Sequence, residues 1–239
     1  MKINTSKTVG ELAVEFPAAT RVFEQAGIDY CCGGGESFEK ACAAAGVAPD
    51  EVARLLEVAE QSPAQPEQDW QTQPLWALTS YIVTRHHSFT KAELSRLDEL
   101  LEKVRSVHGQ NHPELVLVQG LFRELKHEMT THMQKEEMML FPYIDQLDEA
   151  VRQGKPGPMA PFGTVANPVR MMMMEHDAAG DVLKQMREVS QNFTVPADGC
   201  ISYTTLYQAI EAFERDLHQH IHLENNILFP RAIEMEGKV

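Results

Sequence analysis

Apolar and polar positions repeat with a helical period along most of this chain. From residue 75 onward, four long segments place apolar side chains every three or four residues, which gives a helix one apolar face. The segments cover about 75–107, 113–151, 169–192 and 201–233, with polar or proline-rich breaks between them. The pattern predicts an all-α protein whose second part is an up-down four-helix bundle.

A region of shorter helices precedes the bundle. Thr8 and Ser37 stand at expected helix starts, and Gly27 and Gly46 stand at expected helix ends. Residues 1–61 are therefore predicted to form a small helical domain.

The stretch 62–74 has three prolines and no apolar period, which is typical of a linker. The predicted organisation is a helical domain over 1–61, a linker over 62–74 and the bundle over 75–239.

The second and fourth bundle segments share a sequence repeat. HMQKEEMMLFPYI begins at His132, and HIHLENNILFPRA begins 88 residues later at His220. Each copy has a glutamate four residues after its histidine, Glu136 or Glu224, and then Leu-Phe-Pro at the same offset. Residues four apart share a helix face, so each histidine and glutamate can contribute to one metal site.

Both His–Glu pairs lie on the apolar stripe that is predicted to face the core, and Met139 follows on that stripe in the second segment. A buried carboxylate is costly unless it is paired or bound to metal. His87 and His176 precede the two repeat copies by 45 and 44 residues, which places them at the same depth. The predicted metal ligands are His87, His132, Glu136, His176, His220 and Glu224.

Imidazole and carboxylate ligands suit iron, manganese or zinc. Four histidines and two glutamates that can bridge favour a two-metal centre with open positions for water, oxide or a small diatomic molecule. His218 and His222 form a rival pair that the Leu-Phe-Pro register disfavours, and Glu175 is a candidate partner of a ligand. The alternative interpretation, polar helix faces or structural core histidines, does not account for two matching copies.

The second unusual feature is Cys31-Cys32 followed by three glycines. A helix start near Ser37 favours a thiolate here, which is consistent with a reactive thiol, a cluster or metal ligand, or a persulfide carrier. The alternative is a tight turn with two inert cysteines. Cys42 and Cys200 are expected to be small core residues.

The net charge of −14 argues against nucleic acid as a partner, because phosphate binding requires an excess of lysine and arginine. No stretch approaches the roughly 20 apolar residues of a membrane helix, and no export signal is seen at the N-terminus. A cytoplasmic protein with reduced cysteines is expected.

With both features in hand, the chain resembles the Repair of Iron Centres family, whose members join a short cysteine-bearing domain to a hemerythrin-like domain. The motifs that carry the resemblance are DYCCGG, RHH ending at His87, HMQKEE, MEHD and HIHLENNILFP, and it covers nearly the whole chain. It implies two non-haem iron ions per chain, oxo-bridged, on the four histidines and two glutamates above. It also implies repair of iron–sulfur proteins damaged by nitric oxide or peroxide, and often a homodimer. Our leading hypothesis is that the repair proceeds by iron donation.

Two other functions fit the predicted centre. An enzyme would reduce nitric oxide, with two metals holding two molecules of the gas. A binding module would carry or sense NO or O₂, as hemerythrins do, but it would leave the cysteine pair without a role.

Overall fold

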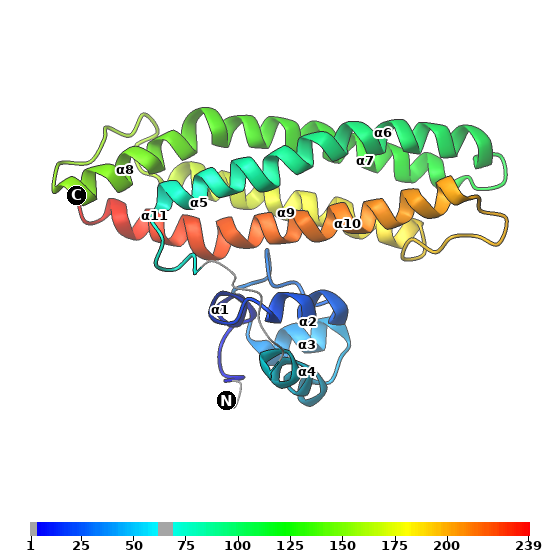
Figure 1. Ribbon diagram of the computed structural model, residues 1–239, viewed down its shortest axis with the longest axis horizontal. Helices are drawn as coiled ribbons and strands as arrows, with labels where there is room; N and C mark the ends of the chain where they lie inside the picture. The colour runs from blue at the N-terminus through cyan, green and yellow to red at the C-terminus, as the bar shows by residue number, and fades with distance from the viewer. Residues whose placement is uncertain (1–3, 62–68) are drawn as a thin grey trace. The chain divides into compact units, whose positions relative to one another are not determined.

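The computed structural model describes residues 4–61 and 69–239, and helices joined by loops make up its regular structure (Figure 1). Within these ranges the β-type pairing is limited to one isolated bridge between Thr8 and Ser37, so the all-α prediction is confirmed. Residues 62–68 of the predicted linker lie outside the described residues. The helices are α1 (Val9–Glu15), α2 (Ala19–Ala26), α3 (Phe38–Ala45), α4 (Pro49–Gln61), α5 (Leu75–Tyr81), η1 (Ile82–His87), α6 (Ser88–His108), α7 (Glu114–Lys135), η2 (Glu136–Leu140), α8 (Phe141–Gln153), α9 (Ala166–Val189), α10 (Ile201–Leu223), η3 (Glu224–Leu228) and α11 (Phe229–Glu236).

The chain divides into two compact units. The first comprises residues 1–79, 145–158 and 218–239, and the second comprises 80–144 and 159–217. The boundaries predicted for the N-terminal domain, the linker and the bundle stay predictions. None of the helices in the described ranges joins enough length to enough apolar character to cross a membrane.

Local capping explains the short helices of the first unit. Thr8 and Glu11 form a capping box at the start of α1, because each side chain accepts a hydrogen bond from the other residue's backbone N–H. Helices α2 and α3 end at Gly27 and Gly46, whose φ angles of 67° and 71° favour glycine. The expected starts and stops are thus confirmed at these residues.

The α1–α4 part of the first unit has an apolar core of its own. Val9, Phe23, Phe38 and Leu56 are each 0 % exposed, and Cys42 is buried among them as expected. Burial of each large side chain contributes about 1.5–3 kcal/mol, so this core stabilises the packing of the short helices against one another.

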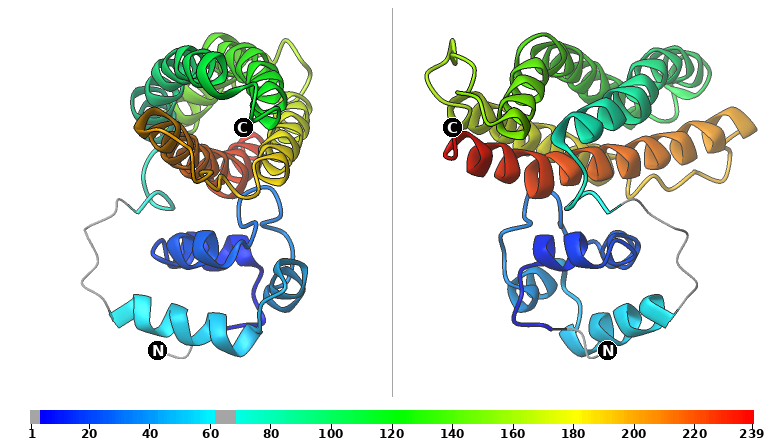
Figure 2. Two further views of the ribbon diagram at one scale, coloured as in Figure 1. Left: turned by 90° about the vertical axis from the view of Figure 1, so that its right-hand side faces the viewer. Right: turned by 60° about the vertical axis from the view of Figure 1, so that its left-hand side comes forward.

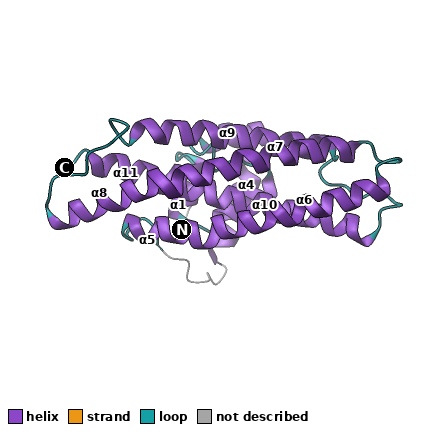
Figure 3. Ribbon diagram, turned by 90° about the horizontal axis from the view of Figure 1, so that it is seen from above, coloured by secondary structure: helices purple, strands orange, loops and turns teal. Residues whose placement is uncertain are grey.

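Four helices run side by side in the second unit: α6, α7, α9 and the part of α10 up to Leu217 (Figures 2 and 3). Helix α7 packs against both α6 and α9. The rings of Phe122 in α7 and Phe213 in α10 meet edge to face with centroids 6.2 Å apart. Arg187 in α9 donates two hydrogen bonds to Glu214 in α10. The predicted bundle arrangement is therefore present.

Three π-helical segments interrupt the predicted α-helices. The segments η1, η2 and η3 widen the helix by one residue per turn, which changes the side of the helix that later residues face. The prediction that Met139 lies on the buried stripe is consequently wrong: Met139 is 56 % exposed, and Leu140 is buried in its place.

Candidate metal centre

Each π-helical segment carries one of the predicted ligands at its end or start. His87 is the last residue of η1, and Glu136 and Glu224 are the first residues of η2 and η3. π-Turns inside α-helices are frequent at functional sites, because they turn a side chain away from the regular helical direction.

The Leu-Phe-Pro motif explains two of the π-turns. The N–H of Phe141 donates to the carbonyl of Glu136, five residues back, and Phe229 does the same to Glu224. The proline that follows each phenylalanine has no N–H and crowds the carbonyl four residues before it. A widened turn at this point avoids part of that conflict.

Four of the predicted ligands lie together in the second unit. Nε2 of His87 and Nε2 of His132 are 3.4 Å and 3.3 Å from Oε2 of Glu136. Nε2 of His176 is 3.0 Å from Nε2 of His132. All four residues are buried, with exposed fractions of 0–1 %.

The second repeat copy has the same local geometry. Nε2 of His220 lies 2.8 Å from Oε1 of Glu224, one helical turn away, and both residues are 0 % exposed. The spacing of four residues thus brings the imidazole and the carboxylate into contact, as it does in the first copy.

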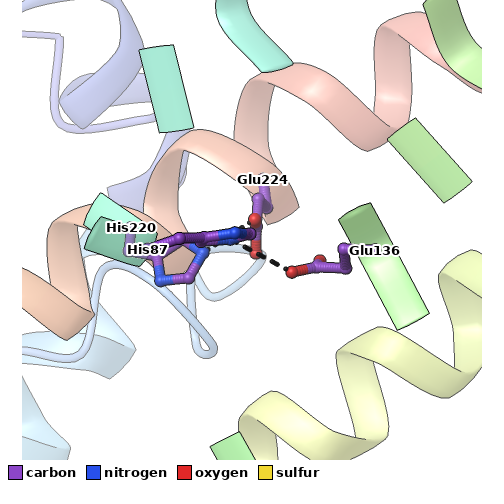
Figure 4. A group of neighbouring side chains, drawn as sticks. All are labelled: His87, Glu136, His220 and Glu224. Atoms are coloured by element: carbon purple, nitrogen blue, oxygen red, sulfur yellow. Dashed lines mark hydrogen bonds and ion pairs between the residues drawn. The ribbon is translucent and has the colours of Figure 1, made fainter. Parts of the chain in front are cut away.

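The predicted ligands form two groups whose donor atoms all lie within 4.8 Å of one another. One group is His87, Glu136, His220 and Glu224 (Figure 4), and the other contains His132, His176 and the same two glutamates. A carboxylate that belongs to both groups is positioned to bridge two ions. The six predicted residues therefore come together as two sites that share their glutamates.

The donor set fits two borderline metal ions such as iron. It contains imidazole nitrogens and carboxylate oxygens and no thiolate. Two nitrogens about 2.1 Å from one ion and at right angles are about 3.0 Å apart, which matches the separation of the His132 and His176 nitrogens. A cation would also offset the cost of burying two carboxylates.

Carboxylates outside the two groups orient two of the histidines. Nδ1 of His87 lies 2.7 Å from Glu137, whose carboxylate also accepts hydrogen bonds from Lys91. Burial opposes ionisation of Glu137, but the hydrogen bonds from Lys91 and His87 outweigh it, and the pKa of Glu137 is lowered. The anionic Glu137 holds the proton of His87 on Nδ1 and leaves Nε2 as a ligand atom.

His132 has a matching arrangement of a histidine, a glutamate and a lysine. Its Nδ1 lies 2.9 Å from Glu175, which also accepts a hydrogen bond from Lys135. The hydrogen bond from His132 lowers the pKa of Glu175 to about 2, with Lys135 adding to the effect against the opposing effect of burial. Glu175 was a predicted ligand partner, whereas Glu137 was missed, although it directly follows Glu136 in the repeat.

Cys31 and Cys32 belong to neither group. They lie in the loop between α2 and α3, with Cys31 buried and Cys32 half-buried, and their sulfurs are 3.9 Å apart. A hydrogen bond to Cys32 and burial raise the pKa of Cys31, so the expectation of a favoured thiolate at Cys31 is wrong. Cys31 lies seven positions before Phe38, where α3 begins, and the hydrogen bond to Cys32 and burial decide the direction of the pKa shift.

Three further histidines, His86, His218 and His222, contact residues outside the two ligand groups. Nδ1 of His86 lies 3.1 Å from Asp216, and Nδ1 of His218 lies 2.8 Å from Glu24. His222 is buried against the ring of Tyr30, and burial lowers the pKa of His222 to about 4. None of these three histidines belongs to the two ligand groups.

The expectation that Cys200 is a core residue is wrong. It is exposed, directly before α10, and its sulfur lies 3.2 Å from Nε2 of His108. Cys200 is the last residue of the loop between α9 and α10, and its thiol is exposed there.

Known proteins similar to this chain cover both of its parts. A family described as "Hemerythrin HHE cation binding domain" matches residues 78–232, and one described as "Domain of Unknown function (DUF542)" matches residues 5–60. The iron–sulfur cluster repair protein YtfE of Yersinia pseudotuberculosis is 37 % identical over 234 residues, which cover 97 % of this chain and 98 % of that protein. The probable iron–sulfur cluster repair protein of Haemophilus influenzae is 35 % identical over 226 residues, which cover 94 % and 96 %.

Proposed function

Since the chain belongs to the Repair of Iron Centres family of hemerythrin-like proteins, we propose that it repairs iron–sulfur clusters damaged by nitrosative or oxidative stress, and that it does so by donating iron. The observation that carries the proposal is the pair of buried ligand groups that share Glu136 and Glu224. The two relatives compared above are named as iron–sulfur cluster repair proteins, and this chain spans nearly all of each.

The chain holds two non-haem iron ions, and we assign them to the six predicted ligands. His87 and His220 would bind one ion, His132 and His176 the other, and the glutamates would bridge them. Bound iron supplies exchangeable metal and a reducing equivalent. The donor side chains are buried, so bulk water does not reach them freely. This slows the loss of ions that are held by few protein ligands.

The ligand chemistry supports iron as the cargo. Imidazole and carboxylate are harder donors than the sulfide and thiolate ligands of an iron–sulfur cluster. A depleted cluster therefore competes well for iron held in this centre. The anionic Glu137 and Glu175 act in the opposite direction, because they make His87 and His132 better ligands and slow the loss of iron.

The partners would be iron–sulfur proteins that have lost iron. From the family resemblance alone we also propose a cytoplasmic location, a homodimer, and NO and O₂ as small molecules that reach the centre.

Iron transfer tests the proposal directly. The full chain would be loaded with isotopically labelled iron and mixed with a dehydratase whose [4Fe–4S] cluster has been damaged by nitric oxide. Labelled iron in the client and recovered client activity are measured together. We expect wild-type protein to transfer iron and to restore activity.

A matched pair of variants separates donation from catalysis. Glu175→Gln weakens the hold on iron, so a donor should transfer iron faster per iron bound than wild type. An enzyme that reduces nitric oxide would instead lose turnover with no gain in transfer. Glu188→Gln changes an exposed glutamate on the same helix and serves as the control. Absence of transfer from fully loaded wild-type protein overturns the proposal.

A further inference from the structure

Three ligand-type side chains converge in the loop that joins α2 to α3. We propose that Asp29, Cys31 and Cys32 bind one divalent transition-metal ion, of the Fe²⁺ or Zn²⁺ class, outside the His and Glu groups. One donor atom from each residue lies within 4.8 Å of the other two. The inference does not rest on the proposed repair function, because it concerns different residues and a different set of donor atoms.

The distances fit a tetrahedral ion. The two sulfurs are 3.9 Å apart, and Sγ of Cys31 is 3.3 Å from Oδ1 of Asp29. Two thiolates about 2.3 Å from a tetrahedral ion are about 3.8 Å apart, and a thiolate and a carboxylate oxygen are about 3.5 Å apart. The two measured separations thus differ from these values by only a few tenths of an ångström, and Sγ of Cys32 lies within 4.8 Å of a carboxylate oxygen of Asp29.

The backbone of the loop fixes the positions of these donors. Oδ1 of Asp29 accepts hydrogen bonds from the backbone N–H of Cys31 at 3.1 Å and of Cys32 at 2.9 Å. A Cβ atom on Gly33 would lie 3.2 Å from Oδ2 of Asp29 and 3.0 Å from its main-chain oxygen. Glycine at this position therefore keeps the space beside the carboxylate open.

Contacts within the first unit hold the same loop from η3. The side-chain amide of Asn226 donates to the carbonyl oxygens of Tyr30 at 3.1 Å and of Cys31 at 3.4 Å. The backbone N–H of Gly10 donates to the carbonyl of Gly34 at 2.8 Å. A loop fixed in this way loses little entropy when it binds a metal, so its affinity is higher than that of a mobile cysteine pair.

The chemistry of the donors decides the class of ion. Two thiolates and one carboxylate select Zn²⁺ or Fe²⁺ over Mg²⁺ or Ca²⁺. The ion would replace the protons of both thiols, which are released to solvent, and no electron is transferred. Three protein ligands leave a fourth position for water or an incoming thiolate.

Cobalt(II) is the probe for this site, because it reports thiolate ligands through charge-transfer absorption. The full chain would first be loaded with iron and its iron content measured, and Co²⁺ would then be added in steps. We expect one Co²⁺ per chain with a thiolate charge-transfer band. The band should be lost in Cys31→Ser and Cys32→Ser and retained in Cys200→Ser. Asp29→Asn, which still accepts the two backbone hydrogen bonds, should weaken Co²⁺ binding by about tenfold or more.

A second measurement needs no variant. In wild-type protein, one equivalent of Zn²⁺ should slow the alkylation of Cys31 and Cys32 at least tenfold, and it should leave the alkylation of Cys200 unchanged, as read by mass spectrometry of the peptides. The proposal is overturned if no charge-transfer band forms, if the band survives in both serine variants, or if Zn²⁺ does not protect the pair. A protein that binds no iron but passes these tests contradicts only the di-iron assignment.

Discussion

Nδ1 of His132 lies 2.9 Å from the carboxylate of Glu175, which is the residue next to His176 in the sequence. One helix therefore supplies both a proposed ligand, His176, and the group that orients the proposed ligand His132 on the neighbouring helix. A carboxylate with a pKa of about 2 is anionic at every pH at which the protein would be studied.

Removing that charge should loosen the iron. In Glu175→Gln the amide oxygen still accepts the hydrogen bond from His132, but the imidazole becomes a weaker ligand. We expect iron affinity to fall about 10–100-fold, measured as the rate of iron removal by a chelator. Glu188→Gln should match wild type. Equal rates for Glu175→Gln and wild type would show that the carboxylate does not act on the metal.

Removing a shared carboxylate should have a larger effect. Glu136 belongs to both ligand groups, so Glu136→Gln is expected to lose more than half of the bound iron, measured per chain by mass spectrometry. Glu128→Gln alters an exposed glutamate on α7 and should keep the full iron content. Retention of two irons by the Glu136 variant would exclude it as a bridging ligand.

A methyl group at position 34 should destabilise the protein. A Cβ atom on Gly34 would lie 2.5 Å from Oδ1 of Asn226 and 2.9 Å from the carbonyl oxygen of Tyr30. We expect Gly34→Ala to lower the free energy of unfolding by about 1–3 kcal/mol in a urea titration. Gly35→Ala is the control, because no atom lies within 4 Å of the added Cβ. Equal stability of the two variants would contradict the close approach of Asn226 to the loop.

Cys200 should react as a thiolate near neutral pH. The hydrogen bond with His108 lowers the pKa of Cys200 from 9.0 to about 7, so its thiolate forms as pH rises through about 7, roughly two units below an ordinary thiol. We expect the rate of Cys200 alkylation to rise with a midpoint near pH 7. In His108→Ala the rate at pH 7 should fall roughly tenfold, and the two proteins should converge above pH 9. His127→Ala, on the exposed side of α7, should leave the profile unchanged, and a midpoint near pH 9 in wild type would exclude the His108 contact.

Helical periodicity was sufficient to predict which histidines and glutamates come together. His132 and Glu136 are four residues apart on an apolar stripe, and the second copy repeats the spacing. Those constraints are local, so they can be predicted from the sequence. The depth of His87 and His176 follows from the lengths of antiparallel helices, which is also a matter of counting residues.

Other features depend on tertiary contacts and could not be predicted from the sequence. The π-turns arise where proline and core packing compete with the α-helical hydrogen bonds, and Met139 faces solvent as a result. The contact of Glu137 with Nδ1 of His87 depends on the position of His87 on another helix. The exposure of Cys200 depends on where the loop before α10 lies. The raised pKa of Cys31 likewise results from its hydrogen bond to Cys32 and from burial, which are both tertiary or loop features.

The three π-turns also limit how the length of this chain can change. One residue of an α-helix corresponds to about 100° of rotation, so deleting a single residue from 82–87, 136–140 or 224–228 would restore a regular helix and turn everything beyond it to another side. A substitution elsewhere in these helices leaves their length unchanged, so such substitutions can accumulate one at a time. Insertions and deletions near the proposed ligands are expected to be excluded, because each would displace a proposed ligand and also the packing of the helix beyond it. Relatives that keep the centre should therefore keep the same number of residues between His132 and Pro142, and between His220 and Pro230.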